Sequence, residues 1–501
     1  MKDRVPIRKL PSGVPGLDEV LGGGIPEFSF NLIAGGPGCG KTTLGHQIMF
    51  ANASPERRAV YLSVIGEPPI KMLRYQQQFA FFDDAKIEDG SVRFVHLGQQ
   101  AIEGGMAKVL EGVVEELDRS NPAIVVVDSF RAMVRSSLAG PHGETELTNF
   151  MQRLALALTS HRATTFLLGE YGDGEHDSAV FTVADGLLWL YQAIERNSVV
   201  RKLQVMKMRG QPQVPGLHTA RITDAGYGVF PRVSRPDEII TDHPLAHRLK
   251  TGVSGLDDLM NGGIPRGYSV LVAGPSGSGK TMLSNQFIVE GVSHGEKGIV
   301  AVFEKRPNDY LQTTPHGAVF QKLVAQGKLE VVYLRPLDLS IDETLLELRD
   351  AVKRIGAKRV VIDSLSGLEL ALAPTFREDF RESLYRLLGA LTGLGVTLMA
   401  TVELVDRYVE LGLSPQGVAF LTDAIIIQRY IEIDGELRRA MSVVKLRASQ
   451  HSKELREYDV TPQGRIVVGK PLKGYQGLLT GTPAPRGKSG KSGKSGKKRK
   501  R

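Results

Sequence analysis

Two stretches of the sequence decide the fold: Gly35-Gly-Pro-Gly-Cys-Gly-Lys-Thr42 and Gly274-Pro-Ser-Gly-Ser-Gly-Lys-Thr281. Each follows an apolar run that is typical of a buried strand, Asn31-Leu-Ile-Ala34 in one case and Ser269-Val-Leu-Val-Ala273 in the other. The spacing Gly-x-x-x-x-Gly-Lys-Thr after a strand is typical of a loop whose backbone N–H groups surround phosphate oxygens at the start of a helix. A single match is compatible with a glycine-rich turn, but two matches in register favour phosphate binding.

The motif predicts a role for the lysine and the threonine of each loop. Lys41 and Lys280 are expected to reach the β- and γ-phosphates of ATP, and Thr42 and Thr281 to ligate Mg²⁺. The candidate nucleotide-binding residues are Gly35, Gly36, Pro37, Gly38, Cys39, Gly40, Lys41, Thr42 and Thr43 in the first copy and Gly274, Pro275, Ser276, Gly277, Ser278, Gly279, Lys280, Thr281 and Met282 in the second.

The chain is a duplication of one whole domain. Leu10-Pro-Ser-Gly-Val-Pro-Gly-Leu-Asp18 returns 239 residues later as Leu249-Lys-Thr-Gly-Val-Ser-Gly-Leu-Asp257, and the two phosphate loops have the same offset. This period is far longer than the 20 to 50 residues of solenoid repeats. We expect a first domain over residues 1–233, a linker over 234–247, a second domain over 248–470, a C-terminal segment over 471–485 and a tail over 486–501.

Within each copy, short β-branched runs alternate with segments of helical periodicity. Ala123-Ile-Val-Val-Val-Asp128 and Arg359-Val-Val-Ile-Asp-Ser364 are typical of buried parallel strands, and residues 344–354 place apolar side chains at helical spacing. The predicted class is α/β, with a mainly parallel central sheet in each copy. Asp128 and Asp363 each end such a strand, which predicts a carboxylate for the Mg²⁺ site. A helix-capping aspartate is the alternative.

Composition restricts the function classes. The 501 residues include one cysteine, so an intramolecular disulfide framework and a cysteine-based zinc site are excluded. The start of the chain lacks the apolar stretch of a secretory signal, and no run is long enough to cross a membrane, so we expect a cytoplasmic protein. Of the 63 Lys and Arg, nine lie in residues 486–501 without any acid, which leaves 54 against 55 Asp and Glu in the rest. The net charge of +8 therefore comes from a tail that we expect to be disordered. The tail could bind nucleic acid or anionic lipid, or act only as a solubilising segment.

Several features together resemble the KaiC family of the RecA superfamily. They are the two copies, the Gly-Val-x-Gly-Leu-Asp entry, the Gly-Gly-Ile-Pro turns at residues 23–26 and 262–265, and Gly474-Tyr-Gln-Gly-Leu-Leu-Thr-Gly481. The resemblance implies two tandem RecA-like domains that assemble as a double-ringed hexamer, with ATP between neighbouring subunits. It also implies that Lys207 and Arg209, and Lys445 and Arg447, reach the γ-phosphate held by the neighbour. A solvated basic strand face is the alternative for these four cations.

The acid that the resemblance implies to be catalytic differs between the copies. The family places two consecutive glutamates after the strand that follows the phosphate-loop helix, where the first polarises the attacking water or hydroxyl. The second copy keeps this first acid as Glu304, whereas Ile65 or Gly66 stands there in the first copy and Glu67 comes one or two residues late. We therefore expect hydrolysis mainly in the second domain. A surface acid without a role is the alternative for Glu304.

Self-phosphorylation is a further property that the resemblance implies. The family carries adjacent Ser and Thr acceptors just before a Thr-Asp pair, but here Ala419 and Phe420 precede Leu421-Thr-Asp423. Thr422 or Ser414 would have to substitute. We therefore expect an ATP-hydrolysing regulatory switch with an unidentified protein partner. The alternatives are a serine/threonine autokinase and a DNA-dependent RecA-like ATPase, the latter disfavoured by the electroneutral body.

Three further residues have weaker assignments. Glu170 and Glu403 follow strands where RecA-like folds often carry a γ-phosphate sensor, although exposed acids without a role fit equally well. Cys39 lies near a helix N-terminus, which would lower the pKa of its thiol and favour reactivity. The favoured interpretation is that Cys39 is a small loop filler without a function, since Ser278 stands at the same place in the second copy.

Overall fold

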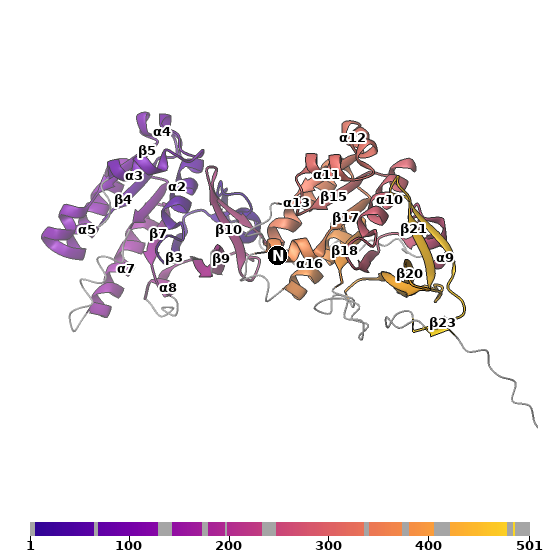
Figure 1. Cartoon of the computed structure of the whole chain (residues 1–501). Coiled ribbons are helices and arrows are strands. Elements are labelled where there is room, and N and C mark those ends of the chain that lie inside the picture. The colour runs from indigo at the N-terminus through magenta and orange to yellow at the C-terminus, as the bar shows by residue number, and fades with distance from the viewer. Residues whose placement is uncertain are drawn as a thin grey trace, which may run out of the picture. The chain divides into compact units, whose positions relative to one another are not determined.

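The structure is a computed structural model that describes residues 6–64, 69–128, 143–172, 179–195, 198–232, 247–334, 340–372, 380–404, 421–477 and 484–485. The chain divides into two compact units, Met1–Ser234 and Arg235–Arg501, which we call domain 1 and domain 2. Figure 1 shows that each unit is a sheet with helices packed against it. The predicted α/β class, in two tandem domains, is thereby confirmed.

Domain 1 is built on a nine-stranded sheet of order β11-β10-β9-β8-β3-β7-β6-β4-β5. The strands are β3 (Phe30–Gly35), β4 (Ala59–Ser63), β5 (Val92–His96), β6 (Ile124–Asp128), β7 (Thr164–Glu170), β8 (Gly186–Glu195), β9 (Ser198–Met208), β10 (His218–Thr223) and β11 (Gly226–Phe230). From β8 to β5 every neighbouring pair is parallel, while β9, β10 and β11 extend the sheet as antiparallel strands. The sheet is therefore mixed but mainly parallel.

Helices cover both faces of this sheet. They are α1 (Leu17–Leu21), α2 (Lys41–Asn52), α3 (Pro69–Gln76), α4 (Ala85–Glu88), α5 (Gly98–Ser120), α7 (Gly143–Ser160) and α8 (Ala179–Val183). Apolar residues of α1, α2 and α3 pack on one face, and those of α5, α7 and α8 on the other, because alternate strand residues point to opposite faces. The short strands β1 (Lys9–Leu10) and β2 (Ile25–Pro26) pair beside the sheet.

Domain 2 repeats this topology with the order β16-β15-β17-β18-β14-β19-β20-β21-β22. The strands are β14 (Ser269–Gly274), β15 (Gly298–Val302), β16 (Leu329–Tyr333), β17 (Arg359–Asp363), β18 (Thr397–Glu403), β19 (Ala424–Ile433), β20 (Glu436–Leu446), β21 (Arg456–Val460) and β22 (Ile466–Pro471). Short pairs are formed by β12 (Arg248–Leu249) with β13 (Ile264–Pro265) and by β23 (Tyr475–Gln476) with β24 (Ala484–Pro485).

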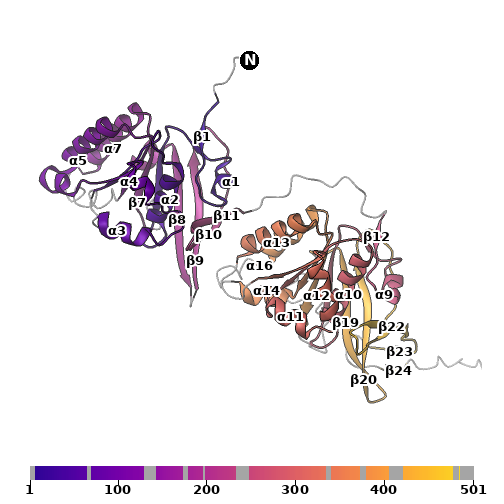
Figure 2. The same cartoon turned by 90° about the horizontal axis from the view of Figure 1, so that it is seen from above.

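The helices of domain 2 are α9 (Ser254–Leu259), α10 (Lys280–Ser293), α11 (Pro307–Thr313), α12 (Gly317–Ala325), α13 (Ile341–Ile355), α14 (Leu365–Ala371) and α16 (Phe380–Gly393). Figure 2 shows α13 and α16 on one side of the sheet and α10, α11 and α12 on the other. The helix that the periodicity of residues 344–354 predicts is α13, which begins at Ile341 because Ser340 caps it by accepting a hydrogen bond from the Glu343 N–H.

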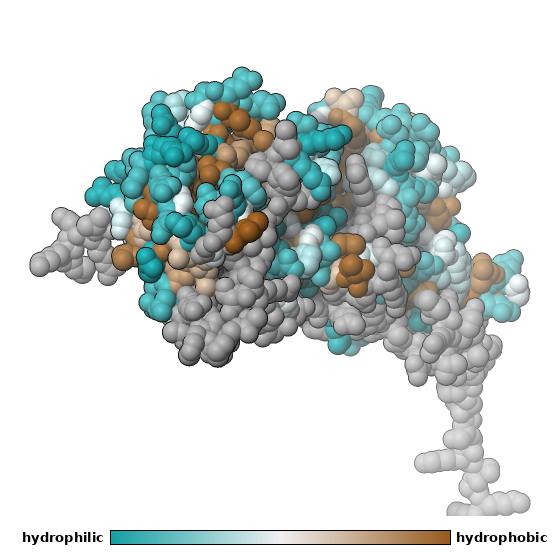
Figure 3. All heavy atoms as spheres, turned by 90° about the vertical axis from the view of Figure 1, so that its left-hand side faces the viewer, coloured by the Kyte–Doolittle hydropathy of each residue, from teal (hydrophilic) through white to brown (hydrophobic). Residues whose placement is uncertain are grey.

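The described residues on the face in Figure 3 are mostly polar. On the face in Figure 3, hydrophilic side chains cover most of the described surface and the hydrophobic ones form separate patches. None of the described helices combines the length and the apolar character that a membrane span requires.

Candidate functional site

Each phosphate loop joins a buried central strand to a helix at the carboxyl edge of the sheet. Strand β3 ends at Gly35 and β14 at Gly274, and the helices α2 and α10 begin at the loop lysines. Gly40 and Gly279 precede these helices with φ of 98° each, a left-handed conformation in which a side chain would be strained. The Lys41 ammonium donates to the carbonyls of Gly35 and Gly36 at 2.9 and 2.7 Å.

The second loop has the same internal geometry. The Lys280 ammonium donates to the carbonyls of Gly274 and Pro275, both at 2.8 Å. Burial lowers the pKa of Lys280, while the nearby charges of Glu403 and Asp363 act in the opposite direction. Lys280 is therefore close enough to Glu403 and Asp363 for their charges to interact.

The aspartates that end β6 and β17 lie beside the loop threonines. The Thr42 hydroxyl donates to Oδ2 of Asp128 at 3.1 Å, and the Thr281 hydroxyl donates to Oδ2 of Asp363 at 2.8 Å. Both acids lie at the carboxyl ends of parallel strands, the edge that also carries the phosphate loops. The structure thus brings together the residues that the sequence analysis assigned to a metal site.

These oxygen donors fit Mg²⁺. Hydroxyl and carboxylate oxygens are its preferred ligands, and Mg²⁺ is usually held by one or two carboxylates together with substrate phosphates. Across the described ranges, no group of three or more His, Cys, Asp or Glu could hold a metal. A Thr and Asp pair that relies on nucleotide phosphates for further ligands is consistent with this finding.

Each aspartate has a second hydroxyl donor that sequence reasoning missed. In domain 1 the Tyr61 hydroxyl of β4 donates to Oδ2 of Asp128, and in domain 2 the Thr401 hydroxyl of β18 donates to Oδ1 of Asp363 at 2.6 Å. Burial raises the pKa of Asp128, and the bonds from Tyr61 and Thr42 oppose this rise. Burial is also the largest cause of the raised pKa of Tyr61. The negative charge of Asp128 is the next largest cause and raises this pKa further.

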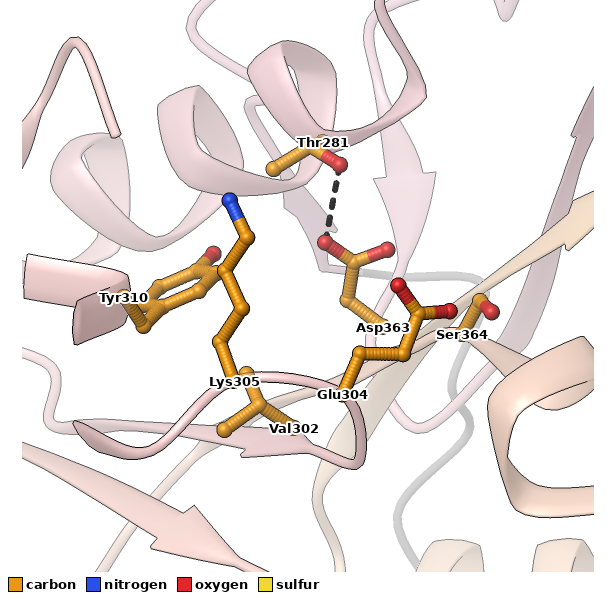
Figure 4. Close-up of a pocket in the computed structure, with 7 residues that line it drawn as sticks. All are labelled: Thr281, Val302, Glu304, Lys305, Tyr310, Asp363 and Ser364. Carbon is orange, nitrogen blue, oxygen red and sulfur yellow. Dashed lines mark hydrogen bonds between the residues drawn. The ribbon is translucent and has the colours of Figure 1, made fainter. Parts of the chain in front are cut away.

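Glu304 lies in a cavity beside the metal pair of domain 2. The cavity has a volume of about 190 Å³, and Glu304, Lys305, Tyr310, Thr281 and Asp363 are among its lining residues. In Figure 4 the Glu304 carboxylate lies near Asp363 and Ser364, and the dashed line marks the bond between Thr281 and Asp363. A larger cavity of about 400 Å³ shares Glu304 and Asp363 and is also lined by the phosphate loop and Glu403.

The corresponding part of domain 1 is only partly described. Strand β4 ends at Ser63, and the residues aligned with Glu304, Ile65 or Gly66, lie outside the described residues together with Glu67. Glu170 ends β7 and pairs with Gly35, and Glu403 ends β18 and pairs with Gly274, so both candidate sensor residues lie at the strand position next to a phosphate loop.

The four cations that are expected to act on a neighbouring subunit lie near the amino ends of the central strands, whereas the phosphate loops follow the carboxyl ends. The Lys207 ammonium donates to the Phe181 carbonyl at 3.2 Å, and Arg209 donates to Asp185 at 3.1 Å. Asp185 in turn accepts the N–H of Phe30, the first residue of β3, whereas the phosphate loop begins after the last residue of that strand. Five residue steps of a strand span about 16 Å.

Domain 2 has the same arrangement. Lys445 donates to the Thr422 carbonyl at 2.6 Å and Arg447 to Asp423 at 3.2 Å, while Asp423 accepts the N–H of Ser269 at the start of β14. Burial lowers the pKa of both Lys207 and Lys445, and the charge of the neighbouring arginine acts in the same direction. The cations of each domain are therefore far from the phosphate loop of their own sheet.

Cys39 is a core residue. Its side chain is fully buried, in one hydrophobic cluster with Leu190 and Tyr227. Burial raises the pKa of its thiol, and the effect of Lys41 in the other direction is smaller. The expectation that a helix N-terminus lowers this pKa is wrong, because desolvation dominates.

A family model described as a KaiC ATPase matches residues 10–234 and, a second time, residues 249–473. The chain belongs to the KaiC family. Its similarity to the circadian clock oscillator protein KaiC of Picosynechococcus is 24% identity over 485 residues, covering 95% of this chain and 92% of that protein. The circadian clock protein KaiC3 of Synechocystis is 27% identical over 508 residues, 95% of each chain. ATP binding and hydrolysis are activities that membership of the KaiC family implies.

The residues at the expected acceptor positions are partly described. Ser414, Ala419 and Phe420 lie outside the described residues, as does the basic tail. Thr422 is 1% exposed, and its carbonyl holds the Lys445 ammonium. Thr422, one of the two residues that would have to substitute as acceptor, is therefore buried.

Proposed function

We propose that the chain is an ATP-hydrolysing regulatory switch that works as a hexamer, with hydrolysis mainly in domain 2. One observation supports the assignment of hydrolysis mainly to domain 2: Glu304 lines the same cavity as Thr281 and Asp363. At the aligned position domain 1 has Ile65 or Gly66, which cannot accept a proton.

The chemistry of domain 2 follows from the charges of the cavity. Glu304 accepts a proton from the attacking water while the water oxygen forms a bond to the γ-phosphorus. The bond between the γ-phosphorus and the oxygen of the β-phosphate breaks. Lys280 neutralises phosphate charge from within the loop. Thr281 and Asp363 would hold Mg²⁺, which supplies further charge neutralisation when bound.

The position of the basic strand ends supports an oligomer. Lys445 and Arg447 lie at the amino edge of their sheet, about 16 Å along β14 from the loop of the same chain. They can meet transition-state charge only at a phosphate held by another subunit. Lys207 and Arg209 have the same constraint in domain 1. We infer that ATP lies between neighbouring subunits of the ring.

The test is Glu304→Gln in the full chain. The variant keeps size and hydrogen bonding but cannot accept the proton, so ATP turnover is expected to fall on the order of 100-fold while ATP affinity stays within about twofold. Steady-state phosphate release and equilibrium binding of a fluorescent ATP analogue measure the two quantities. The control is Glu330→Gln, which removes a carboxylate at the amino end of β16.

The companion variant is Lys41→Ala in domain 1. We expect it to weaken nucleotide binding and ring assembly and to leave most turnover per assembled ring in place. Equal losses of turnover per ring in Glu304→Gln and Lys41→Ala would contradict the division between the domains.

A further inference from the structure

The two domains hold the same carboxylate through different hydroxyls. In domain 1 the Thr42 and Tyr61 hydroxyls both donate to Oδ2 of Asp128. In domain 2 the Thr281 hydroxyl donates to Oδ2 of Asp363 and the Thr401 hydroxyl to Oδ1. The threonine of the phosphate loop is common to both, whereas the second donor comes from a different neighbouring strand.

Strand register explains why the second donor is a threonine in one domain and a tyrosine in the other. Strand β17 lies between β15 and β18, and the pairing of Ile362 with Ala400 places Thr401 opposite Asp363, where a short side chain suffices. Tyr61 of β4 pairs with Val126 and is thus a diagonal neighbour of Asp128. Diagonal neighbours lie about 7 to 8 Å apart, a distance that only a long side chain spans.

Each domain lacks the donor that the other uses. Leu168 of β7 stands opposite Asp128, since Val127 pairs with Leu167. Val300 of β15 stands where domain 1 has Tyr61, two residues before the partner of the aspartate. The second hydrogen bond is therefore kept in both domains although the residue that makes it has changed.

The ring of Tyr61 is fixed by packing. Tyr61 is 1% exposed, and its ring centroid lies 4.5 Å from that of His46 and 5.4 Å from that of Phe94. A buried side chain packed against two other rings presents its hydroxyl at one place. The Asp128 carboxylate is thereby held in one orientation beside Thr42.

We propose that Tyr61 is the positioning residue of the Asp128 carboxylate and sets the affinity of domain 1 for Mg²⁺ together with nucleotide. It does for domain 1 what Thr401 does for domain 2. The inference rests on the proposed function, because it takes Thr42 and Asp128 as the metal side of an ATP site.

The test measures nucleotide binding against Mg²⁺ concentration in the full chain. A Lys280→Ala background weakens nucleotide binding in domain 2, so that binding of a fluorescent ATP analogue reports domain 1. Tyr61→Phe is expected to raise the Mg²⁺ concentration for half-maximal binding on the order of 10-fold, as is typical for loss of a group that orients a metal ligand. Metal-free binding in EDTA should stay the same.

The matched control is Tyr227→Phe. Tyr227 is also 1% exposed and belongs to domain 1, but its hydroxyl has no hydrogen-bond partner among the described residues. Removing this hydroxyl is expected to leave the Mg²⁺ dependence unchanged.

A rescue separates positioning from general damage. Adding Leu168→Thr to Tyr61→Phe places a hydroxyl opposite Asp128, as in domain 2, and is expected to restore at least half of the lost Mg²⁺ affinity on a logarithmic scale. Valine has the shape of threonine without its hydroxyl, so Leu168→Val should restore none of the lost Mg²⁺ affinity. Thermal melting verifies that all variants are folded.

Three results would overturn the inference. They are an unchanged Mg²⁺ dependence in Tyr61→Phe, an equal loss of binding in EDTA, and equal rescue by Leu168→Val and Leu168→Thr. If the parent itself bound nucleotide without any Mg²⁺ dependence, the proposed metal site of domain 1 would fail and this inference with it.

Discussion

Cys39 shows how burial decides the chemistry of a single residue. The thiol lies in the phosphate loop but points into the core, 3.8 Å from the Lys41 ammonium. Because burial raises its pKa, the thiolate fraction in the folded protein at neutral pH is smaller than that of a free thiol. The residue therefore packs and is not poised to react.

We expect native Cys39 to resist alkylation by iodoacetamide at pH 8 and to react fully in guanidinium chloride. The labelling rate should still rise with pH above the ordinary thiol range, since the raised pKa moves thiolate formation upward. The chain contains one cysteine, so mass spectrometry of the labelled protein reports this residue alone. Native labelling as fast as that of a free thiol would contradict the assignment.

The residues of the site differ in how far the sequence reveals them. Lys41, Thr42 and Asp128 were predicted because a local motif and a strand end mark them, and the structure brings them together. Tyr61 and Thr401 were missed, because their roles depend on which residue faces which across two strands. No local pattern carries that register.

At the scale of elements, a β-bulge precedes the basic pair in both domains. Leu187 pairs with Lys207 but Leu188 pairs with Val205, so Met206 is an extra residue in β9. The same shift occurs in β20, where Val444 lies between the residues paired with Ile425 and Ile426. A bulge increases the local twist and redirects the side chains that follow it.

The redirected cations lead to a prediction about mixed rings. Lys280→Ala subunits lack a working loop and Arg447→Ala subunits lack the cation, so each alone is expected to lose most ATP turnover. A mixed ring contains junctions between an intact loop and an intact Arg447, and turnover should return in part. Phosphate release after subunit exchange, verified by a fluorescence label on each variant, measures this. Rings that exchange subunits and stay inactive would show that Arg447 does not act across the junction.

The elements themselves were largely predictable. The runs ending at Asp128 and Asp363 are strands β6 and β17, and strand and helix alternate as hydrophobic periodicity indicated. The three antiparallel strands that follow β8 and β19 were not anticipated. Their pairing depends on hairpin geometry and on the bulges, whereas the parallel core follows from continuous apolar runs that need burial on both faces.

At the scale of the whole molecule, we expect the chain to differ from the KaiC family pattern in phosphorylation chemistry. Ala419 and Phe420 offer no hydroxyl, and Thr422 lies two residues further, about 6 to 7 Å along an extended chain. In-line transfer needs an approach of about 3 to 3.5 Å to the phosphorus. Thr422 is also buried, so its hydroxyl is shielded.

We therefore expect ATPase activity without stoichiometric self-phosphorylation. Phosphosite mapping by mass spectrometry after long incubation with Mg²⁺ and ATP is the measurement, and residual label should fall on Thr422 or Ser414 at low occupancy. High occupancy at any Ser or Thr between residues 410 and 425 would restore the kinase interpretation.

The duplication makes each copy of the domain an internal reference for the other. Domain 1 is one compact unit, and apolar clusters of its described residues lie on both faces of its own sheet. A substitution such as Tyr61→Phe therefore changes one copy of the duplicated site and leaves the residues of the other copy as a standard in the same sample. Differences between the two copies can then be measured free of errors in concentration, buffer or temperature.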